Sequence, residues 1–331
     1  MHQRQLGPFK VSAIGLGCMN MSMGYGKADA DESVRLLNEC LDAGYNFLDT
    51  ASMYGMGHNE TLIGDNLAHR RADYVLASKC GIVKNDKGGT RLDGRPSTVK
   101  KTCEESLKHL KTDVIDLYYL HRLDPQVAIE ESIGALSELV TEGKIKTIGL
   151  SEVCEETVRR AHAVHAITAI QSEYSLWTRT PERRVFSVCR ELGITFVAFS
   201  PLGRSFLTGV TVDSTRVGKD DLRGTIGLPR FTPENFVKNL KLLDSFGVIA
   251  TQQNCSMAQL ALAWILARED KTIIPIPGSK DVNHMHENAG AGDIVLDADV
   301  VQTLDDLINE DTVAGRRYTD ALMASTDSER D

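Results

Sequence analysis

Short apolar runs alternate with longer amphipathic segments along most of the chain. Residues 31–43 place Val34, Leu37 and Leu41 on one face, begin with acidic residues and end before Gly44, which predicts an α-helix. The same reasoning predicts further helices near residues 58–67, 97–110, 129–142, 155–164 and 181–192, one after residue 276, and one carrying Trp264 that opens with a capping box at Ser256–Gln259.

Eight apolar runs precede or separate these helices, and each is short enough to be a buried strand. Strands separated by helical crossovers imply a parallel sheet, and eight such units predict a closed (β/α)8 barrel, the α/β fold called a TIM barrel. Since no Pro- or Ser-rich linker interrupts the pattern, we expect one domain over residues 1–331. The runs end at Leu16, Asp49, Lys79, His121, Leu150, Gln171, Phe199 and Ile276.

Three segments stand outside the barrel pattern. Residues 1–12 predict a short β-hairpin, because Gly7 and Pro8 separate two β-rich stretches. Residues 200–235 are rich in Gly and Pro, which predicts an active-site loop with little regular structure. Residues 324–331 are polar, and we expect them to be frayed.

Composition narrows the possible partners. A net charge of −9 argues against nucleic acid or an anionic membrane surface, since both reward clustered Lys and Arg. Seven Cys without a Cys-x-x-Cys pair suggest neither a disulfide framework nor a thiolate metal site, and no metal is expected. Residues 1–10 lack the apolar core of a signal peptide, and the apolar stretch 260–267 is too short to span a bilayer. We therefore expect a cytoplasmic protein, whose oligomeric state the sequence leaves open.

Four polar residues, Asp49, Tyr54, Lys79 and His121, lie at or just beyond the ends of three neighbouring predicted strands. Barrel enzymes carry their catalytic groups at the carboxyl ends of strands, so the four side chains are expected to meet. A phenol has an ordinary pKa of about 10, and a nearby ammonium favours its ionised form. An Asp would hold the Lys, and a His could orient a polar substrate. Together the four predict a site for proton transfer.

Lys79 taken alone allows a different chemistry. A Lys at the end of a barrel strand could form a Schiff base with a carbonyl substrate, as in a class I aldolase. A lyase of that kind is therefore an alternative at this point.

Several spaced motifs in this order resemble the aldo-keto reductase superfamily, and the resemblance extends over essentially the whole chain. It implies reversible hydride transfer between a nicotinamide cofactor and a carbonyl compound, as in its NADP-dependent microbial members. Tyr54 would then be the general acid, Lys79 would lower its pKa, Asp49 would pair with Lys79, and His121 would orient the carbonyl group. The motifs are residues 44–51 with Tyr54 and Gly55, residues 143–151, residues 200–203 and residues 276–280.

The resemblance also implies a set of cofactor contacts. Ser151 and Gln171 would hold the nicotinamide carboxamide, and Phe199 would stack on the ring beside Ser200. The pyrophosphate would lie against the next turn, and Gly278 would lead into a helix whose N-terminus offers free N–H groups to an anion. Ser279 and Lys280 could meet a 2′-phosphate, so NADP(H) is expected in preference to NAD(H). The remaining residues implied are Leu202, Gly203 and Arg204 at the pyrophosphate, and His284, Glu287 and Asn288, which share a helix face with Lys280 on the adenosine side.

Two sequence features qualify this picture. Gly15-Leu16-Gly17 begins like a Rossmann fingerprint, but position 20 is Asn, so that fingerprint is absent. Many relatives carry Asn after the Ser that ends strand five, whereas this chain has Glu152, which puts one carboxamide contact in question.

The substrate is expected to be a small carbonyl compound or alcohol, and its identity is left open. The pocket would be shaped by the region after Tyr54 and by residues 84–96, 205–230 and 311–323. The second of these carries Lys84, Lys87, Arg91 and Arg95, which would either attract an anionic substrate or form a solvated basic loop. A further alternative is a cofactor-sensing regulatory subunit with slow turnover, since some barrels of this resemblance bind partner proteins.

Overall fold

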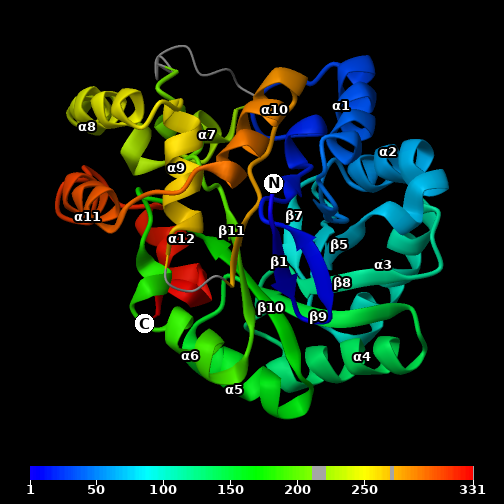
Figure 1. The fold of residues 1–331 in the computed structure, drawn as a ribbon. Helices are drawn as coiled ribbons and strands as arrows, with labels where there is room; N and C mark the ends of the chain where they lie inside the picture. The colour runs from blue at the N-terminus through cyan, green and yellow to red at the C-terminus, as the bar shows by residue number, and fades with distance from the viewer. Residues whose placement is uncertain (211–220, 269–271, 331) are drawn as a thin grey trace.

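Eight parallel strands form the centre of the molecule in the computed structural model, which describes residues 1–210, 221–268 and 272–330 (Figure 1). Adjacent strands of the sheet follow one another along the chain, apart from a small hairpin inserted after β5. The predicted (β/α)8 fold is confirmed. The strands are β3 (Leu16–Gly17), β4 (Phe47–Asp49), β5 (Val75–Cys80), β8 (Ile115–Leu120), β9 (Ile145–Ser151), β10 (Ile167–Glu173), β11 (Thr195–Phe199) and β12 (Ile273–Pro275).

The sheet closes between its first and last strands. Gly17 forms a parallel bridge with Gly278 and donates its N–H to the carbonyl of Pro277 at 3.1 Å. A Cβ atom at Gly17 would lie 2.8 Å from the carbonyl oxygen of Ile276, so the close approach requires glycine. The Gly-Leu-Gly segment therefore closes the barrel. The first strand is also shorter than the predicted 13–16, because only Leu16 and Gly17 pair with β4.

Helices lie around the outside of the strands (Figure 1). Most follow the predicted bounds closely, and Ser256 and Gln259 make the expected reciprocal capping box. The sixth helix begins at Val185, later than the predicted 181, because Thr180–Glu182 forms a separate 3-10 turn. The outer helices are α1 (Ala30–Asp42), α2 (His58–Leu67), α3 (Pro96–Leu110), α4 (Ile129–Thr141), α5 (Glu155–Val164), α6 (Val185–Leu192), α9 (Met257–Leu266) and α10 (Val282–Gly290).

The predicted N-terminal hairpin, β1 (Gln3–Leu6) and β2 (Phe9–Ser12), is confirmed and lies in front of the barrel strands near the centre of Figure 1. Its Leu6 and Val11 are fully buried in one apolar cluster with the inward-facing side chains of the barrel, among them Phe47. Arg4 is also buried and donates to the carbonyls of Ile273 and Leu266. The hairpin thus closes the end of the barrel opposite the carboxyl ends of the strands.

Several elements differ from the expectations. The described part of residues 200–235 contains short helical turns and α7 (Leu222–Thr225), while residues 211–220 lie outside the described residues. Residues 324–330 are not frayed, because Thr326, Asp327 and Ser328 are buried and Asp327 accepts a hydrogen bond from Cys154 N at 2.9 Å. Elements not predicted are β6 (Ile82–Lys84), β7 (Thr90–Leu92), α8 (Pro233–Gln252), α11 (Ala298–Leu307) and α12 (Asp320–Ser325).

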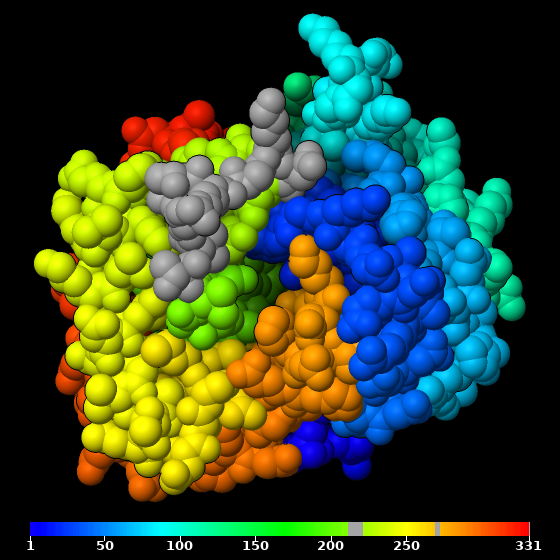
Figure 2. Space-filling view, turned by 90° about the horizontal axis from the view of Figure 1, so that it is seen from above, coloured from blue at the N-terminus to red at the C-terminus, as the bar shows by residue number. Residues whose placement is uncertain are grey.

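Seen from above, onto the carboxyl ends of the strands, the molecule is hollowed near its centre (Figure 2). The hollow is bordered by the N-terminal loops, in blue, and by the α10 region, in orange. None of the helices in the described ranges is both long and apolar enough to cross a membrane.

Candidate active site

The four predicted catalytic residues meet at one end of the barrel. Asp49 ends β4, Lys79 lies near the end of β5, His121 directly follows β8, and Tyr54 lies in the turn after β4. The Lys79 ammonium contacts the Asp49 carboxylate and lies 3.3 Å from the Tyr54 hydroxyl. The Tyr54 and His121 rings meet edge to face, with their centroids 5.9 Å apart. Parallel strands in adjacent positions therefore bring the four side chains into one group.

Lys79 is held as a cation. Its side chain is fully buried, and Nζ donates to the carbonyl of Thr50 at 2.8 Å as well as to Asp49. Burial by itself lowers the pKa of Lys79, but Asp49 and Tyr54 together raise it by more, so that the pKa lies above its ordinary value of 10.5. The second Asp49 oxygen accepts a hydrogen bond from Gln171 Nε2 at 2.7 Å. The ion pair is thus fixed on both sides.

The pKa of Tyr54 differs from the expectation. Burial raises the pKa of this phenol above 10, and the lowering by Lys79 offsets only part of that effect. The Tyr54 pKa is therefore not lowered toward neutral pH, and that expectation is wrong. Burial, Arg122 and Lys79 all lower the pKa of His121, which lies well below 6.5, so its imidazole is neutral at physiological pH.

These residues line one cleft together with the residues expected to hold the nicotinamide. Ser151 ends β9, Gln171 lies in β10 and Phe199 ends β11, and all three border the same cleft as Tyr54 and His121. The Gln171 amide donates one of its two N–H groups to Asp49. Its carbonyl oxygen and its second N–H are left for a ligand.

The turn after β11 has an unusual backbone. Ser200, Gly203 and Arg204 have positive φ angles of 48°, 57° and 56°, which turn the chain sharply at the mouth of the cleft. Leu202 and Ser200 border the cleft, whereas Gly203 packs beneath the ring of Trp177. The guanidinium of Arg204 donates to Glu173 at 2.8 Å, so this expected pyrophosphate contact is already paired with a carboxylate.

The region after β12 corrects one expectation. The N-terminus of α10 does not offer free N–H groups, because Asp281 accepts from Asn283 N and His284 N. A second carboxylate, from Glu32, accepts from Val282 N at 3.2 Å. Two acidic side chains therefore occupy the positive end of this helix, which is unfavourable for a further anion.

The other residues expected near the adenosine are spread over this region. Gly278 borders the cleft, and Ser279 is buried with its hydroxyl on the carbonyl of Asp281. Lys280 donates to the carbonyls of Tyr25 and Lys27, at 2.9 and 3.3 Å. The three residues farther along α10 lie away from the part of the cleft that the described residues form: His284 is exposed, Glu287 is half-buried and Asn288 is buried.

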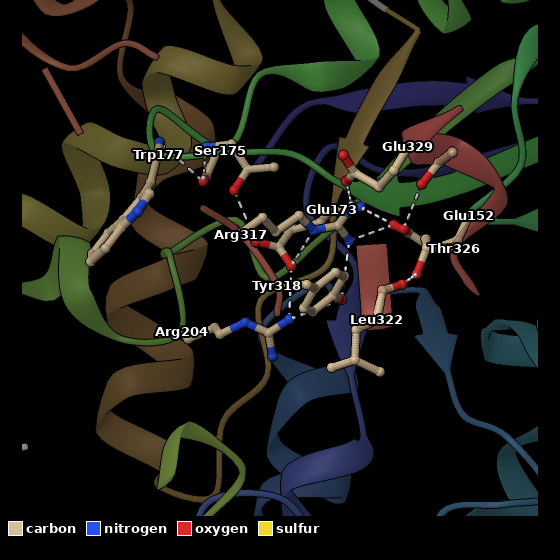
Figure 3. Close-up of polar contacts among 12 residues, drawn as sticks. Glu152, Glu173, Ser175, Trp177, Arg204, Arg317, Tyr318, Leu322, Thr326 and Glu329 are labelled. Atoms are coloured by element: carbon tan, nitrogen blue, oxygen red, sulfur yellow. Dashed lines mark hydrogen bonds and ion pairs between the residues drawn. The ribbon is translucent and has the colours of Figure 1, made fainter. Parts of the chain in front are cut away.

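Glu152 does not border the cleft that the described residues form and is part of a buried charge network (Figure 3). Its Oε1 accepts from Arg317 at 2.8 Å and from the N–H of Glu173 at 2.9 Å, and its Oε2 accepts from Ser328 at 2.8 Å. Burial raises the pKa of the Glu152 carboxyl, but Arg317 and Arg122 lower it by more, so it lies below its ordinary value. Glu152 thus binds residues 317–330, the C-terminal segment. Its carboxylate does not take the place of the Asn that contacts the carboxamide in many relatives.

The same network includes Glu173, Arg204 and Glu329 (Figure 3). Arg317 donates to Glu173 at 3.1 Å and to Glu329 at 2.9 Å, and its guanidinium lies 5.9 Å from the centroid of the Phe199 ring. The C-terminal segment is therefore tied to the ends of β9 and β10, directly behind the expected cofactor residues.

Several cleft residues were not predicted individually. Arg122 borders the cleft beside His121. Tyr318 comes from residues 311–323, which were expected to help shape the pocket, but the residue itself was not singled out. Asn20 and Tyr25 come from the loop after β3. Arg122 could have been identified from the sequence, because it is a charged residue at the end of an apolar strand. No local pattern marks the others, because their positions depend on how distant loops fold over the barrel.

Comparison with known proteins agrees with this geometry. The family model described as the aldo/keto reductase family matches residues 13–309. The chain belongs to the aldo/keto reductase family. A probable aldo-keto reductase from Glycine max is 38% identical over 316 residues, which cover 95% of this chain and 90% of that protein.

Solved structures of this family are similar over nearly the whole chain. A glycerol dehydrogenase from Gluconobacter oxydans has a TM-score of 0.82 at 28% identity, covering 92% of this chain and 94% of that one. An aldo-keto reductase from Klebsiella pneumoniae, in complex with NADP and acetate, has a TM-score of 0.73 at 25% identity, covering 96% and 99%. As an aldo/keto reductase, the protein is a nicotinamide-dependent oxidoreductase that acts on small carbonyl compounds.

Proposed function

We propose that this aldo/keto reductase reversibly reduces an aldehyde or ketone to the alcohol with NADPH, and that Tyr54 is its general acid. The observation that carries the proposal is the 3.3 Å approach of the Lys79 ammonium to the Tyr54 hydroxyl, in a cleft that His121 also borders. When bound, the nicotinamide cofactor supplies the hydride to the carbonyl carbon.

Each of the four residues has a defined part in this proposal. The neutral His121 donates a hydrogen bond to the carbonyl oxygen and orients it. Tyr54 then transfers its hydroxyl proton to that oxygen as the carbon is reduced, which leaves a phenolate. The Lys79 cation stabilises this phenolate, and Asp49 keeps Lys79 charged and in place. In the reverse direction the phenolate accepts the alcohol proton.

The residues present fit a dinucleotide. Gly17, Gly278, Tyr54 and His121 all line the cleft, with Ser151 and Gln171 as further polar groups. A Cβ atom on Gly278 would lie 3.0 Å from the Asn20 side chain and would narrow the cleft there. Phe199 supplies an aromatic surface on which a ring can stack.

The Schiff-base alternative is disfavoured by the state of Lys79. An amine attacks a carbonyl through its free electron pair, so it must be deprotonated. The pKa of Lys79 is raised above 10.5 by Asp49 and Tyr54 together, and its side chain is fully buried. A complete proton-transfer group beside an open cleft also supports turnover over a purely regulatory role.

Replacing Tyr54 by Phe tests the assignment of the acid. We expect turnover of a reactive aldehyde to fall by at least about 100-fold, because general acid catalysis contributes that much or more. NADPH binding, measured by fluorescence quenching, should be retained. The matched control is Tyr74→Phe, since the Tyr74 hydroxyl has no hydrogen-bond partner among the described residues. Retained turnover in Tyr54→Phe would disprove the assignment.

We further propose that NADPH is preferred over NADH through Lys280. This ammonium contacts only backbone carbonyls among the described residues, so its charge is available to a 2′-phosphate. Lys280→Met should raise the KM for NADPH by about tenfold, the loss expected for a charge-assisted contact, and leave the KM for NADH nearly unchanged. Equal changes for both cofactors would contradict the preference and indicate a structural role for Lys280 instead. The exposed Lys238→Met serves as the control.

A further inference from the structure

The cleft contains an arginine that lies next to the proposed catalytic group. Arg122 directly follows His121 and is half-buried at the cleft wall between the ends of β8 and β9. Its Nη1 donates to the carbonyl of His121 at 2.6 Å and to the hydroxyl of Ser151 at 3.0 Å. The two contacts hold the guanidinium group in place. Nε and Nη2 have no hydrogen-bond acceptor in the part of the chain that the structure describes, so both are available as donors.

Unlike Lys79 and Arg204, Arg122 makes no close ion pair with any described residue, and it acts on the nearby Glu152 carboxylate only through its charge. Lys79 is paired with Asp49, and Arg204 is paired with Glu173. Among residues 1–210, 221–268 and 272–330, no carboxylate lies within 4.0 Å of the Arg122 guanidinium. Its charge nevertheless reaches the reaction centre, since it lowers the pKa of His121 and of Tyr54. An unpaired cation at this position is suited to a ligand of opposite charge.

The basic loop after β5 does not supply such a cation. Arg91 and Arg95 both pair with the buried Asp93, at 2.7 and 2.5 Å. Of the hairpin in this region, only Ile82 borders the cleft. The sequence left open whether this loop attracts anions. Its two arginines share the single Asp93 carboxylate, and neither they nor Lys84 and Lys87 border the cleft that the described residues form.

We propose that Arg122 binds a carboxylate of the substrate, so that the cleft prefers aldehydes or ketones whose apolar body carries a carboxylate. A guanidinium matches a carboxylate through paired, charge-assisted hydrogen bonds. The apolar body is inferred from the side chains around the proton donor, which include Met19, Met23, Met53, Ile82, Leu222 and Ile226. The inference rests on the proposed carbonyl reduction, because it names the substrate class of that same site.

A second role for Arg122 makes a different prediction. If the guanidinium served only to position Ser151 for the nicotinamide, its loss would slow the reduction of charged and neutral substrates equally. The two roles are therefore separated by the ratio of rates for a charged and a neutral substrate of the same shape.

The test compares 4-carboxybenzaldehyde with its methyl ester, which keeps the aldehyde and the ring but has no charge. The quantity measured is the ratio of their kcat/KM values, with NADPH as reductant. In Arg122→Gln we expect this ratio to fall by at least about tenfold, since a charge-assisted contact is lost. Arg122→Lys should give an intermediate ratio, because it keeps the charge but not the paired geometry.

Arg91→Gln is the matched control, because it removes an equal charge near the cleft from a residue already paired with Asp93. Its ratio should equal that of the wild type. An unchanged ratio in Arg122→Gln, or an equal fall in Arg91→Gln, would overturn the inference while ester reduction by the wild type left the proposed function intact. If the wild type reduces neither compound nor any other carbonyl compound, the proposed function is overturned and the inference with it.

Discussion

At the residue scale, the Tyr54 hydroxyl lies between two opposing influences. Burial raises the pKa of the phenol, and the neighbouring Lys79 ammonium lowers it by less. A phenol with a raised pKa stays protonated at neutral pH and is always ready to donate. What the Lys79 cation adds, in the proposed reaction, is stabilisation of the phenolate that remains after the proton has left. The pair therefore acts on the product of proton transfer more than on the resting acid.

These pKa directions predict the pH dependence of the reaction. The Tyr54 pKa lies above 10 and the His121 pKa lies well below 6.5, so neither group titrates in the intervening range. The kcat/KM for carbonyl reduction should therefore vary by less than about twofold between about pH 6 and pH 9. Alcohol oxidation should rise with pH over the same range, since it requires the phenolate. A pH profile in both directions checks this, and an inflection near pH 7 for reduction that disappears in Tyr54→Phe would contradict it.

At the element scale, the barrel and its strand ends could be predicted because both depend on patterns of neighbouring residues in the sequence. A polar residue after a short apolar run marked Asp49, Lys79 and His121, and all three meet in space. Helix α8 could also have been predicted from the sequence, since Pro233 opens it and Phe236, Leu243 and Phe246 are buried on one side. It was missed because the preceding Gly- and Pro-rich stretch suggested a long loop.

The C-terminal segment could not be predicted in this way. Its anchor, Arg317, is paired with Glu152 and Glu173, which lie 165 and 144 residues earlier in the chain. A polar tail looks the same in sequence whether it is solvated or bound by such distant partners. The occupied N-terminus of α10 is a similar case, because one of its two carboxylates comes from Glu32 on α1.

The anchoring of this segment gives a prediction for Arg317. Arg317→Ala would leave the buried carboxylates of Glu152 and Glu173 facing one another, and we expect a loss of about 3–5 kcal/mol in unfolding free energy. Hydrogen exchange should increase first in residues 317–330. The adjacent Arg316 is 63% exposed and pairs only with the exposed Asp320, so Arg316→Ala should cost less than about 1 kcal/mol. Similar losses in the two variants, measured by urea unfolding, would show that the buried network does not hold the segment.

At the scale of the whole molecule, buried charge is concentrated on one side of the barrel, behind the cleft. Three carboxylates and two arginines connect β9, β10, the turn after β11 and the C-terminal segment. Burying so many charges is tolerated because each carboxylate accepts from at least one guanidinium. The opposite end of the barrel is closed by the apolar side chains of the N-terminal hairpin. The fold is therefore expected to respond to acid at the cleft end first.

Glu173 makes this response measurable. Burial raises its pKa, but Arg204, Arg317 and Arg230 lower it by more, to about 2 from an ordinary value of 4.5. Because the folded-state pKa is the lower one, the stabilisation is complete above pH 4.5 and is lost as the pH falls toward 2, and it is on the order of 3 kcal/mol. The difference in urea midpoint between wild type and Glu173→Gln should therefore be large at pH 7 and shrink as the pH falls below 4.5. Glu310→Gln, at an exposed pair with Arg183, should show a small difference at every pH. If the Glu173→Gln difference stays constant with pH, the carboxylate does not gain its stabilisation from the arginine network.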